Sequence, residues 1–295
     1  MNIRTRGEKI FSVFNYLLMI IIGIITLYPL WHILMASISD PAHLLVDRGF
    51  YLWPKGEIGF RGYFLVFENP NIINGFTNTL FYVIVGASLC MFVTILGAYV
   101  LSRKGLYWNS LIMKLVIFTM YFQGGLIPFY ILVRNMGLLG SQWAIILPVL
   151  VNTWNLIILR TSFAALPSSL LESAKIDGAS EWRIVWQIAV PLAKATVSVI
   201  ALFYAVYFWN EWFNPSIFLT DRTRWPIQLI LRDILIQNDT GAMTQVGTVG
   251  QTGIERYRIL VRYSTIIIAT VPVLLIYPFI QKYFVSGIMI GSLKE

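Results

Sequence analysis

Hydrophobic residues are concentrated in six long runs, and polar residues lie mainly between them. The runs cover residues 11–36, 76–101, 111–133, 142–160, 196–219 and 263–281. A bilayer core of roughly 30 Å requires about 20 helical residues at about 1.5 Å each. Backbone groups in lipid must also bond within their own segment, which favours helices. The pattern therefore predicts an all-α membrane protein with six transmembrane helices.

Composition agrees with this prediction. Hydrophobic residues make up 57% of the chain and charged residues 12%, with a mean hydropathy of +0.71, whereas soluble domains carry about 25% charged residues. Six helices and their loops nearly use up 295 residues, so we expect no soluble catalytic domain. The first run could belong to a signal peptide, but it is longer than a signal core of about 7–15 residues. We expect it to be retained.

Loop charges suggest the orientation of the chain. An even number of spans places both termini on one side, and the compact segments 1–10 and 102–110 are rich in Lys and Arg. Short basic loops stay in the cytoplasm, whereas long loops cross largely regardless of charge. We therefore expect a cytoplasmic N-terminal segment at 1–10 and a transmembrane domain at 11–295. Both termini would be cytoplasmic, and the long segments 37–75 and 220–262 would lie outside.

The inner segment 166–191 predicts two short helices separated by a turn. Ser169 and Glu172 have the spacing of a capping box, which would start the first helix just after Pro167. Gly178 would end it, because glycine adopts the left-handed conformation without a steric penalty. Ser180 would cap the second helix.

The second helix has a periodic apolar face and would lead into the fifth span. This face consists of Trp182, Val185, Trp186 and Ala189, and Pro191 marks the entry to the span. One interpretation is a helix pair lying on the lipid surface. The other is docking into a protein groove, which is favoured because the charged and apolar residues of the first helix do not separate onto two faces.

The string Glu172-Ser-Ala-Lys-Ile-Asp-Gly178-Ala, followed by Pro191, carries a family resemblance. It resembles the "EAA" loop of ABC-importer permeases, in which Glu-Ala-Ala is followed by three residues and Gly. Ser173 replaces one alanine, a small-for-small change. The resemblance implies the type I ABC importer permease fold, with a coupling helix that docks on a cytoplasmic ATPase. The implied coupling residues are Glu172, Ser173, Ala174, Asp177, Gly178 and Ala179.

Further segments extend the resemblance over most of the chain. They are Gly124-Gly-Leu-Ile-Pro128, Asn135-Met-Gly-Leu-Leu139 and the terminal 287–295. Together with Asp177-Gly-Ala, they are similar to carbohydrate-uptake permeases of the maltose type, and to the subgroup of lipoprotein-associated oligosaccharide and polysaccharide permeases. Members of that subgroup import alginate and pectin fragments.

The resemblance also implies a set of partners and a location. The partners are a homologous second permease, two ATPase subunits, an extracellular or lipid-anchored solute-binding protein, and an oligosaccharide. The location is the bacterial cytoplasmic (inner) membrane, in contact with membrane lipid. In maltose-type relatives the C-terminal tail inserts between the ATPases, and a frayed terminus is the alternative for residues 287–295.

Several chemistries are not expected in this chain. No Gly-x-x-x-x-Gly-Lys-Ser/Thr stretch occurs, so we expect no cofactor here, with ATP and Mg on the partner ATPases. Neither His32 nor His43 has neighbours at metal-ligand spacing, and we expect no metal, no catalytic residue and no enzyme activity. The net charge of +8 is explained by cytoplasmic loops rather than by nucleic acid. We expect Cys90, inside the second run, to be a packing residue.

Polar side chains along the fifth run suggest a substrate path. Tyr207, Asn210, Glu211 and Asn214 recur at helical spacing, with Tyr204 one turn earlier. Polar groups at membrane depth usually face other helices or a watery path, and aromatic rings with amides suit sugars. Packing, or an aromatic belt that includes Trp209 and Trp212, is the alternative.

Two further pairs lie within the predicted spans. Asn152 and Asn155 are a second candidate for the path, and helix–helix hydrogen bonding explains them as well. Gly86 and Gly97 lie three turns apart and predict a close-packing face on the second span.

The outer segment 226–237 predicts a helix along the membrane surface, followed by a polar, glycine-rich stretch. Such a stretch is flexible, and the resemblance implies that it contacts the binding protein. The alternative is an ordinary surface loop with no partner. The candidate contact residues are Asn238, Gly241, Gly247, Gly250 and Gly253.

Other classes of protein make different demands on the sequence. A secondary transporter would show internal repeats and mid-span ionisable residues, and only Glu211 suggests one. A membrane enzyme would need clustered His, Asp or Cys. An ABC importer for a non-sugar solute remains open.

Overall fold

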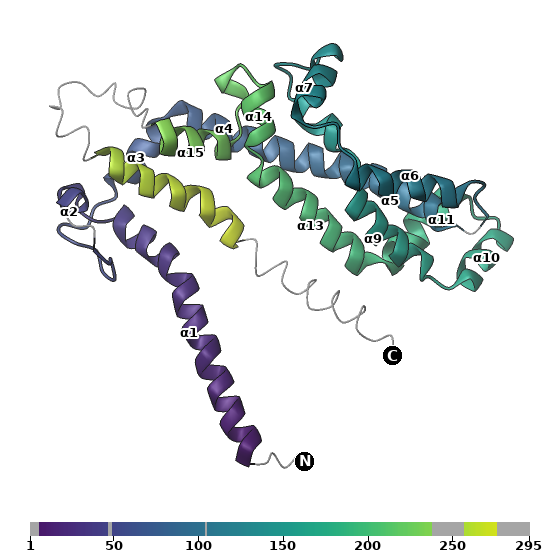
Figure 1. Cartoon of the computed structure of the whole chain (residues 1–295), viewed down its shortest axis with the longest axis horizontal. Helices are drawn as coiled ribbons and strands as arrows, with labels where there is room; N and C mark the ends of the chain where they lie inside the picture. The colour runs from purple at the N-terminus through teal and green to yellow at the C-terminus, as the bar shows by residue number, and fades with distance from the viewer. Residues whose placement is uncertain (1–5, 47–48, 104, 238–256, 276–295) are drawn as a thin grey trace. The chain divides into compact units, whose positions relative to one another are not determined.

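The computed structural model describes residues 6–46, 49–103, 105–237 and 257–275, and the regular elements in these ranges are helices (Figure 1). The chain divides into two compact units. The first comprises residues 1–70 and 233–272, and the second comprises residues 71–232 and 273–295. Each unit has a hydrophobic core of its own.

The first unit contains the N-terminal span and the last described helix. Its elements are α1 (Arg6–Ser37), α2 (Pro41–Val46), α3 (Arg61–Glu68) and, through Pro272, a helix at Tyr257–Leu275. Both long helices are apolar enough to cross a membrane. The prediction for 11–36 is therefore confirmed, and the last span begins six residues earlier than predicted. Residues after 275 lie outside the described part.

The second unit begins with one long span. It consists of α4 (Pro70–Phe81), a π-helical turn (Tyr82–Gly86) and α5 (Ala87–Ser102), which together form a helix of 33 residues. The prediction for 76–101 is confirmed, with an earlier start. Cys90 is fully buried in this helix, as expected of a packing residue.

The third hydrophobic run is not one helix, and the prediction of a continuous span at 111–133 is wrong. It forms α6 (Asn109–Tyr121) and α7 (Leu126–Asn135), which meet at 114°. Gly125 has a φ of +82° at the break. Pro128 prevents α7 from extending backwards, because its ring would clash with the carbonyl of Gly124, four residues earlier.

The fourth run is also broken. It consists of α8 (Trp143–Ile146), a 3-10 turn (Leu147–Val149) and α9 (Thr153–Ala164), with a bend of 47°. Asn152 is extended and caps α9. The single span predicted at 142–160 is therefore corrected to a bent pair.

The coupling segment and the fifth run form α10 (Ser168–Ile176), α11 (Glu181–Ile184), a π-helical turn (Val185–Ala189), α12 (Val190–Leu192), α13 (Lys194–Asn210) and α14 (Phe213–Phe218). The chain bends by 90° just after Pro191, where α13 begins. The span predicted at 196–219 ends at Asn210, because Pro215 clashes with the carbonyl of Glu211 in a continued helix.

A 3-10 turn (Arg222–Arg224) and α15 (Ile227–Gln237) follow, and the boundary between the two units falls within α15, after Arg232. The helix predicted at 226–237 is thus confirmed. The predicted contact loop 238–253 and the tail 287–295 lie outside the described residues. Counting each bent pair as one span, the described helices provide up to six spans by length and composition, in agreement with the hydrophobic pattern.

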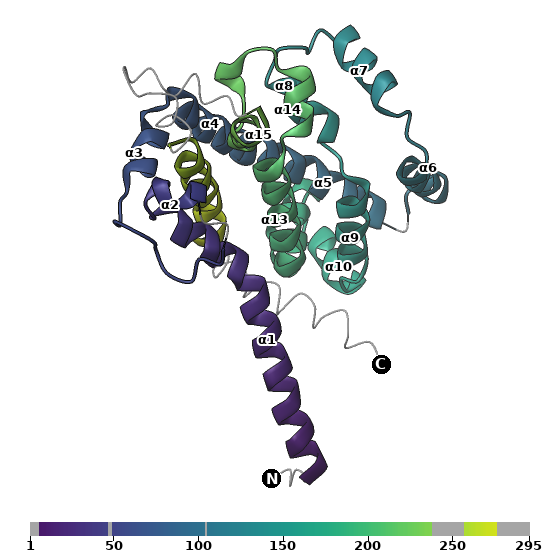
Figure 2. The same cartoon turned by 60° about the vertical axis from the view of Figure 1, so that its left-hand side comes forward.

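Inside the second unit, α5 packs against α9 and α13, and the three helices lie side by side in both views (Figures 1 and 2). The hydroxyls of Thr94 on α5 and Tyr204 on α13 lie 2.8 Å apart. Gly86 allows α13 to approach, since a Cβ there would lie 2.6 Å from the ring of Phe208. This packed set of helices supports the site at the end of α9.

Candidate functional site

Helix α10 begins where the sequence predicts but not by the predicted device. Its N-cap is Pro167, which has no side-chain acceptor, and Ser169 lies inside the first turn. The capping box of Ser169 and Glu172 is therefore absent. The extended backbone of Pro167 starts the helix without it.

The end of α10 follows the prediction closely. Gly178 has a φ of +79°, and its N–H bonds to the carbonyl of Lys175, while the N–H of Ala179 bonds to the carbonyl of Ala174 at 2.9 Å. These two bonds form a Schellman motif, which satisfies the last carbonyls of a helix. The turn then delivers Ser180, whose hydroxyl caps α11 by accepting from the amide of Arg183.

The second helix buries a different face from the one predicted. Val185 and Ala189 are buried as expected, but Trp182 is exposed and Ile184 is fully buried. The π-helical turn at Val185–Ala189 changes the number of residues per turn. An α-helical spacing of i, i+3 and i+4 therefore does not describe this face.

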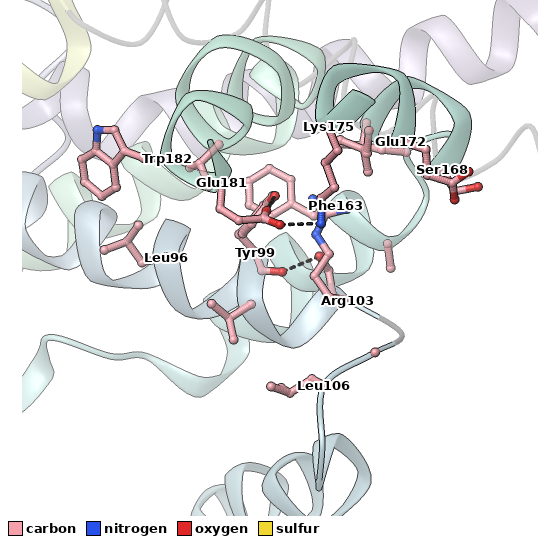
Figure 3. A pocket seen from close by; sticks show the side chains of 17 residues that line it. Leu96, Tyr99, Arg103, Leu106, Phe163, Ser168, Glu172, Lys175, Glu181 and Trp182 are labelled. Carbon is pink, nitrogen blue, oxygen red and sulfur yellow. Dashed lines mark hydrogen bonds and ion pairs between the residues drawn. The ribbon is translucent and has the colours of Figure 1, made fainter. Parts of the chain in front are cut away.

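A cavity of about 760 Å³ lies where α10 and α11 meet the ends of α5 and α9 (Figure 3). Its walls are largely apolar and include Leu96, Phe163 and Leu171. Charged and polar side chains also line it, among them Tyr99, Arg103, Glu172, Lys175 and Glu181.

Glu181 joins three elements at this cavity. The hydroxyl of Tyr99, on α5, donates to Oε2 of Glu181 at 2.5 Å. Nζ of Lys175, on α10, lies 2.5 Å from Oε1 of the same carboxylate (Figure 3). The predicted coupling loop is therefore linked to the end of the second span through one side chain.

Electrostatics favour the ionised form of Glu181. The hydrogen bond from Lys175, followed by that from Tyr99, holds the pKa of the Glu181 carboxyl below its usual value. The ion pair is roughly half exposed, so solvent weakens it. The hydrogen bond to Tyr99, which is 5% exposed, is the better shielded of the two contacts.

Arg103 completes the polar side of the cavity. Its guanidinium carbon lies 4.0 Å from the centroid of the Tyr99 ring. Nε and Nη2 are buried and have no hydrogen-bond partner in the described part of the chain. Tyr99, Arg103 and Glu181 are therefore site residues that sequence reasoning missed, because only the fold brings 99–103 close to 175–181.

The predicted coupling residues do not share one exposed face. Glu172, Ser173, Asp177 and Gly178 are exposed and Ala179 is half-buried, whereas Ala174 packs inward. Ile176 is 86% exposed at the tip of α10, and sequence reasoning did not select it. An exposed apolar side chain beside small and charged residues is the surface that a partner groove would cover.

The predicted path residues separate into two groups. Tyr204, Asn152 and Asn155 belong to the helix packing: the hydroxyl of Tyr204 accepts from the amide of Asn152, whose side chain in turn accepts from the amide of Asn155 at 3.0 Å. Tyr204 and Asn155 are both buried. The alternative of hydrogen bonding between helices describes this group.

The remaining four path residues lie at the break between α13 and α14, not along one helix. Glu211 accepts from the amide of Asn214, in the first turn of α14, at 2.9 Å. The side-chain amide of Asn214 lies 3.4 Å from the hydroxyl of Tyr207. Tyr207 and Asn210 are exposed. Glu211 is thus occupied by a structural contact.

The two tryptophans beside the break differ. Trp209 is buried against Phe76, with ring centroids 6.4 Å apart, which is the arrangement that the packing alternative describes. Trp212 is partly exposed, and the guanidinium carbon of Arg232 lies 4.3 Å from its ring centroid. Among the described residues, no group of three His, Cys, Asp or Glu side chains could hold a metal ion.

Comparisons with known proteins agree with this architecture. Residues 71–290 match the family described as binding-protein-dependent transport system inner membrane component. Protein LplC of Bacillus subtilis is 38% identical over 290 residues, covering 98% of this chain and 97% of that protein. The polygalacturonan/rhamnogalacturonan transport system permease protein YtcP of the same organism is also 38% identical, and the match covers 97% of this chain and 99% of that protein.

A solved structure matches as well. A chain of a bacterial ABC transporter involved in the import of the acidic polysaccharide alginate has a TM-score of 0.86 and 29% identity, covering 96% of this chain and 100% of that one. The family match covers well over half of the chain, and the relatives match nearly end to end. The chain therefore belongs to the family of binding-protein-dependent transport system inner membrane components, as a permease subunit of an ABC importer.

Proposed function

We propose that this chain moves oligosaccharides or polysaccharide fragments across the bacterial cytoplasmic membrane, driven by ATP hydrolysis on separate subunits. The observation that carries the proposal is the similarity over nearly the whole chain to a polygalacturonan/rhamnogalacturonan permease and to a permease of an alginate transporter. Both of those proteins handle polymers of sugars, and neither match is confined to a single motif.

Helix α10 is the proposed coupling helix. Glu172, Ser173, Asp177 and Gly178 would contact a groove on the ATPase, with Ile176 as an apolar anchor. Ala174 and Ala179 would hold the helix on its own chain. The Lys175–Glu181–Tyr99 link would pass the movement of α10 to α5, since it joins these helices through short polar contacts.

The proposed substrate path runs past the break between α13 and α14. Exposed Tyr207 and Asn210 would contact the sugar, with Asn214 held beside them. Glu211 would keep the break in shape, and Tyr204, Asn152 and Asn155 would support it from the helix packing. A kinked helix with exposed amides and an aromatic ring offers sugars both hydrogen bonds and a stacking face.

The remaining parts of the importer are proposed from the family. A homologous second permease would complete the pathway, two ATPase subunits would bind ATP and Mg, and a solute-binding protein would deliver the sugar to the outer side, where residues 238–253 would meet it. Both termini would be cytoplasmic. The family description, which names a binding protein and the inner membrane, supports the delivery step and the location.

Reconstitution tests the proposal. The chain is assembled with the second permease, ATPase and binding protein of its own organism in proteoliposomes that contain ATP, and the uptake of labelled oligogalacturonate and maltotriose is measured. We expect ATP-dependent accumulation of at least one of these sugars. Accumulation of an amino acid or peptide with no sugar uptake would instead assign the importer to a non-sugar solute.

A further inference from the structure

We propose that Arg232 binds a carboxylate of the transported molecule, so that the substrate class of this permease is an acidic, uronate-containing oligosaccharide. The inference rests on the proposed function and adds to it a residue and a chemical class. The feature that carries it is the guanidinium of Arg232 stacked on Trp212 beside the break between α13 and α14.

The stack fixes the guanidinium in place. Its carbon lies 4.3 Å from the centroid of the Trp212 ring, and Arg232 itself is exposed on α15. The planar fork of N–H groups of a guanidinium matches a planar carboxylate. Arg232 is therefore exposed and held beside the Trp212 ring before any ligand arrives.

Within the described residues, Arg232 forms no ion pair with a carboxylate. The glutamate next to the stacked ring, Glu211, directs its carboxylate to the amide of Asn214. No described carboxylate lies within ion-pair distance of Arg232. A guanidinium that has a ring contact and no ion pair within the described residues can accept an external anion without first breaking such a pair.

The exposed side chains around the break suggest that this anion is carried on a sugar. Asn210 and Phe213 are exposed at the break, Tyr207 is exposed one turn before it, and the centroid of the Phe213 ring lies 5.6 Å from that of Trp212. Aromatic faces and amides suit sugar rings and hydroxyls, whereas Arg232 adds one positive charge. The combination fits a sugar that carries a carboxylate better than a neutral sugar or a simple anion.

An experiment with a matched pair of ligands tests this assignment. Trigalacturonate and its trimethyl ester have the same rings and differ in charge. Binding of each to the purified importer without its binding protein is measured by saturation-transfer NMR, for the unchanged protein and for Arg232→Gln, Arg232→Lys and Arg222→Gln. Arg222 is the control because its guanidinium also contacts a tryptophan ring, that of Trp225, at 5.1 Å, in the 3-10 turn before α15.

The expected result is selective for charge. Arg232→Gln should weaken trigalacturonate binding about tenfold or more, since hydrogen bonds to charged groups are worth about 1.5–3 kcal/mol, and should leave ester binding nearly unchanged. The affinity of Arg232→Lys for trigalacturonate should lie between those of the unchanged protein and Arg232→Gln, because lysine keeps the charge but lacks the fork of N–H groups. Arg222→Gln should match the unchanged protein.

Other results would overturn the assignment. Equal losses for acid and ester would make Arg232 a structural or interfacial residue, and no loss would remove it from the site. If the unchanged protein binds and transports maltotriose or the ester but not the acid, the sugar function stands and this inference fails. If it handles no sugar at all, the proposed function itself fails.

Discussion

The hydroxyl of Tyr99 donates to the carboxylate of Glu181 at 2.5 Å, which ties the end of a spanning helix to the first residue after the coupling turn. The same carboxylate holds Lys175 of α10. A hydrogen bond to an ionised acceptor is shorter and stronger than one between neutral groups. In the proposed coupling role, movement of α10 would act on α5 through this side chain as well as through the backbone.

Breaking this link should uncouple ATP hydrolysis from transport. Glu181→Gln removes the charge and weakens both contacts, and Tyr99→Phe removes one of them. We expect each variant to raise the ATP consumed per sugar transported several-fold, which corresponds to a coupling energy of about 1 kcal/mol. The measurement is ATPase activity and sugar uptake in the same proteoliposomes.

The double variant provides the control. Because Tyr99 and Glu181 act through one bond, Tyr99→Phe should add little once Glu181→Gln is present, as expected of coupled sites. Arg183→Gln alters an exposed arginine on α11 that bonds to Gln187 and should leave the ratio unchanged. Fully additive effects of the two variants would show that they act separately.

The turn at Gly178 makes a second prediction, which separates backbone strain from docking. Its φ of +79° requires the left-handed region, and a Cβ there would meet nothing within 4 Å. Gly178→Ala should cost about 1 kcal/mol in the turn, whereas Gly178→Asn should cost less, because asparagine tolerates this conformation. We therefore expect higher uptake with asparagine than with alanine, at equal membrane levels.

The opposite order would change the interpretation. If the larger asparagine reduces uptake more than alanine does, the space that matters at Gly178 belongs to the ATPase groove and not to the turn. Gly105→Ala, in the loop after α5, meets nothing within 4 Å and has no positive φ. It serves as the matched substitution.

The sequence alone predicts the spanning helices and the ends of the coupling turn. Hydropathy depends on residue type and length, so it finds all six runs. The ends of the turn are predictable because Gly178 and Ser180 act on their immediate neighbours. Hydropathy does not locate the breaks at Gly125 and Glu211. There, Pro128 and Pro215 act on carbonyls four residues back, and this local conflict overrides the apolar run.

Hydropathy and local spacing also do not predict contacts between residues that are distant in sequence. Glu181 meets Tyr99 across 82 residues, and Arg232 meets Trp212 only because α15 folds back toward α14. Spacing rules for one helix also fail after a π-helical turn, which is why Ile184 rather than Trp182 is buried. The predicted path residues are divided for a different reason: α13 ends at Asn210, and Asn214 lies beyond the break on α14.

Gly86 provides a third prediction, on packing. A Cβ there would lie 2.6 Å from Cζ of Phe208, whose side chain is 1% exposed. Gly86→Ala should destabilise the protein by about 1–3 kcal/mol through overpacking, seen as a lower melting temperature of the purified importer. Adding Phe208→Leu should recover part of the loss.

Gly23 is the control for that substitution. It lies in α1, and a Cβ there would meet nothing within 4 Å, so Gly23→Ala should leave the melting temperature unchanged or slightly raised, because alanine favours helix over glycine. A loss at Gly86 that Phe208→Leu fails to relieve would rule out the ring as its cause.

Glu211 tests whether an acid in the predicted path acts on substrate or on structure. Its carboxylate accepts from the amide of Asn214, a bond that the side-chain oxygen of glutamine can also make. Glu211→Gln should therefore keep most of the uptake, and Glu211→Ala should lose stability by about 1 kcal/mol, as when a helix cap is removed. A large loss of uptake in Glu211→Gln at normal stability would indicate that the charge itself is needed.

The pH dependence of the Glu181 link has a defined sign. The pKa of this carboxyl is lowered from its ordinary value of 4.5, first by Lys175 and then by Tyr99. The unfolded chain therefore takes up this proton before the folded protein does, and the link contributes fully above the ordinary value. Its contribution is lost as the pH falls from 4.5 through the lowered pKa.

We therefore expect the melting-temperature difference between the unchanged importer and Glu181→Gln to stay constant between about pH 5.5 and 7.5 and to shrink below about pH 4.5. Glu172→Gln is the matched control, because Glu172 lines the same cavity and is exposed. A difference that shrinks near neutral pH would mean that the folded protein holds this proton more tightly than the unfolded chain, which would place Glu181 away from Lys175.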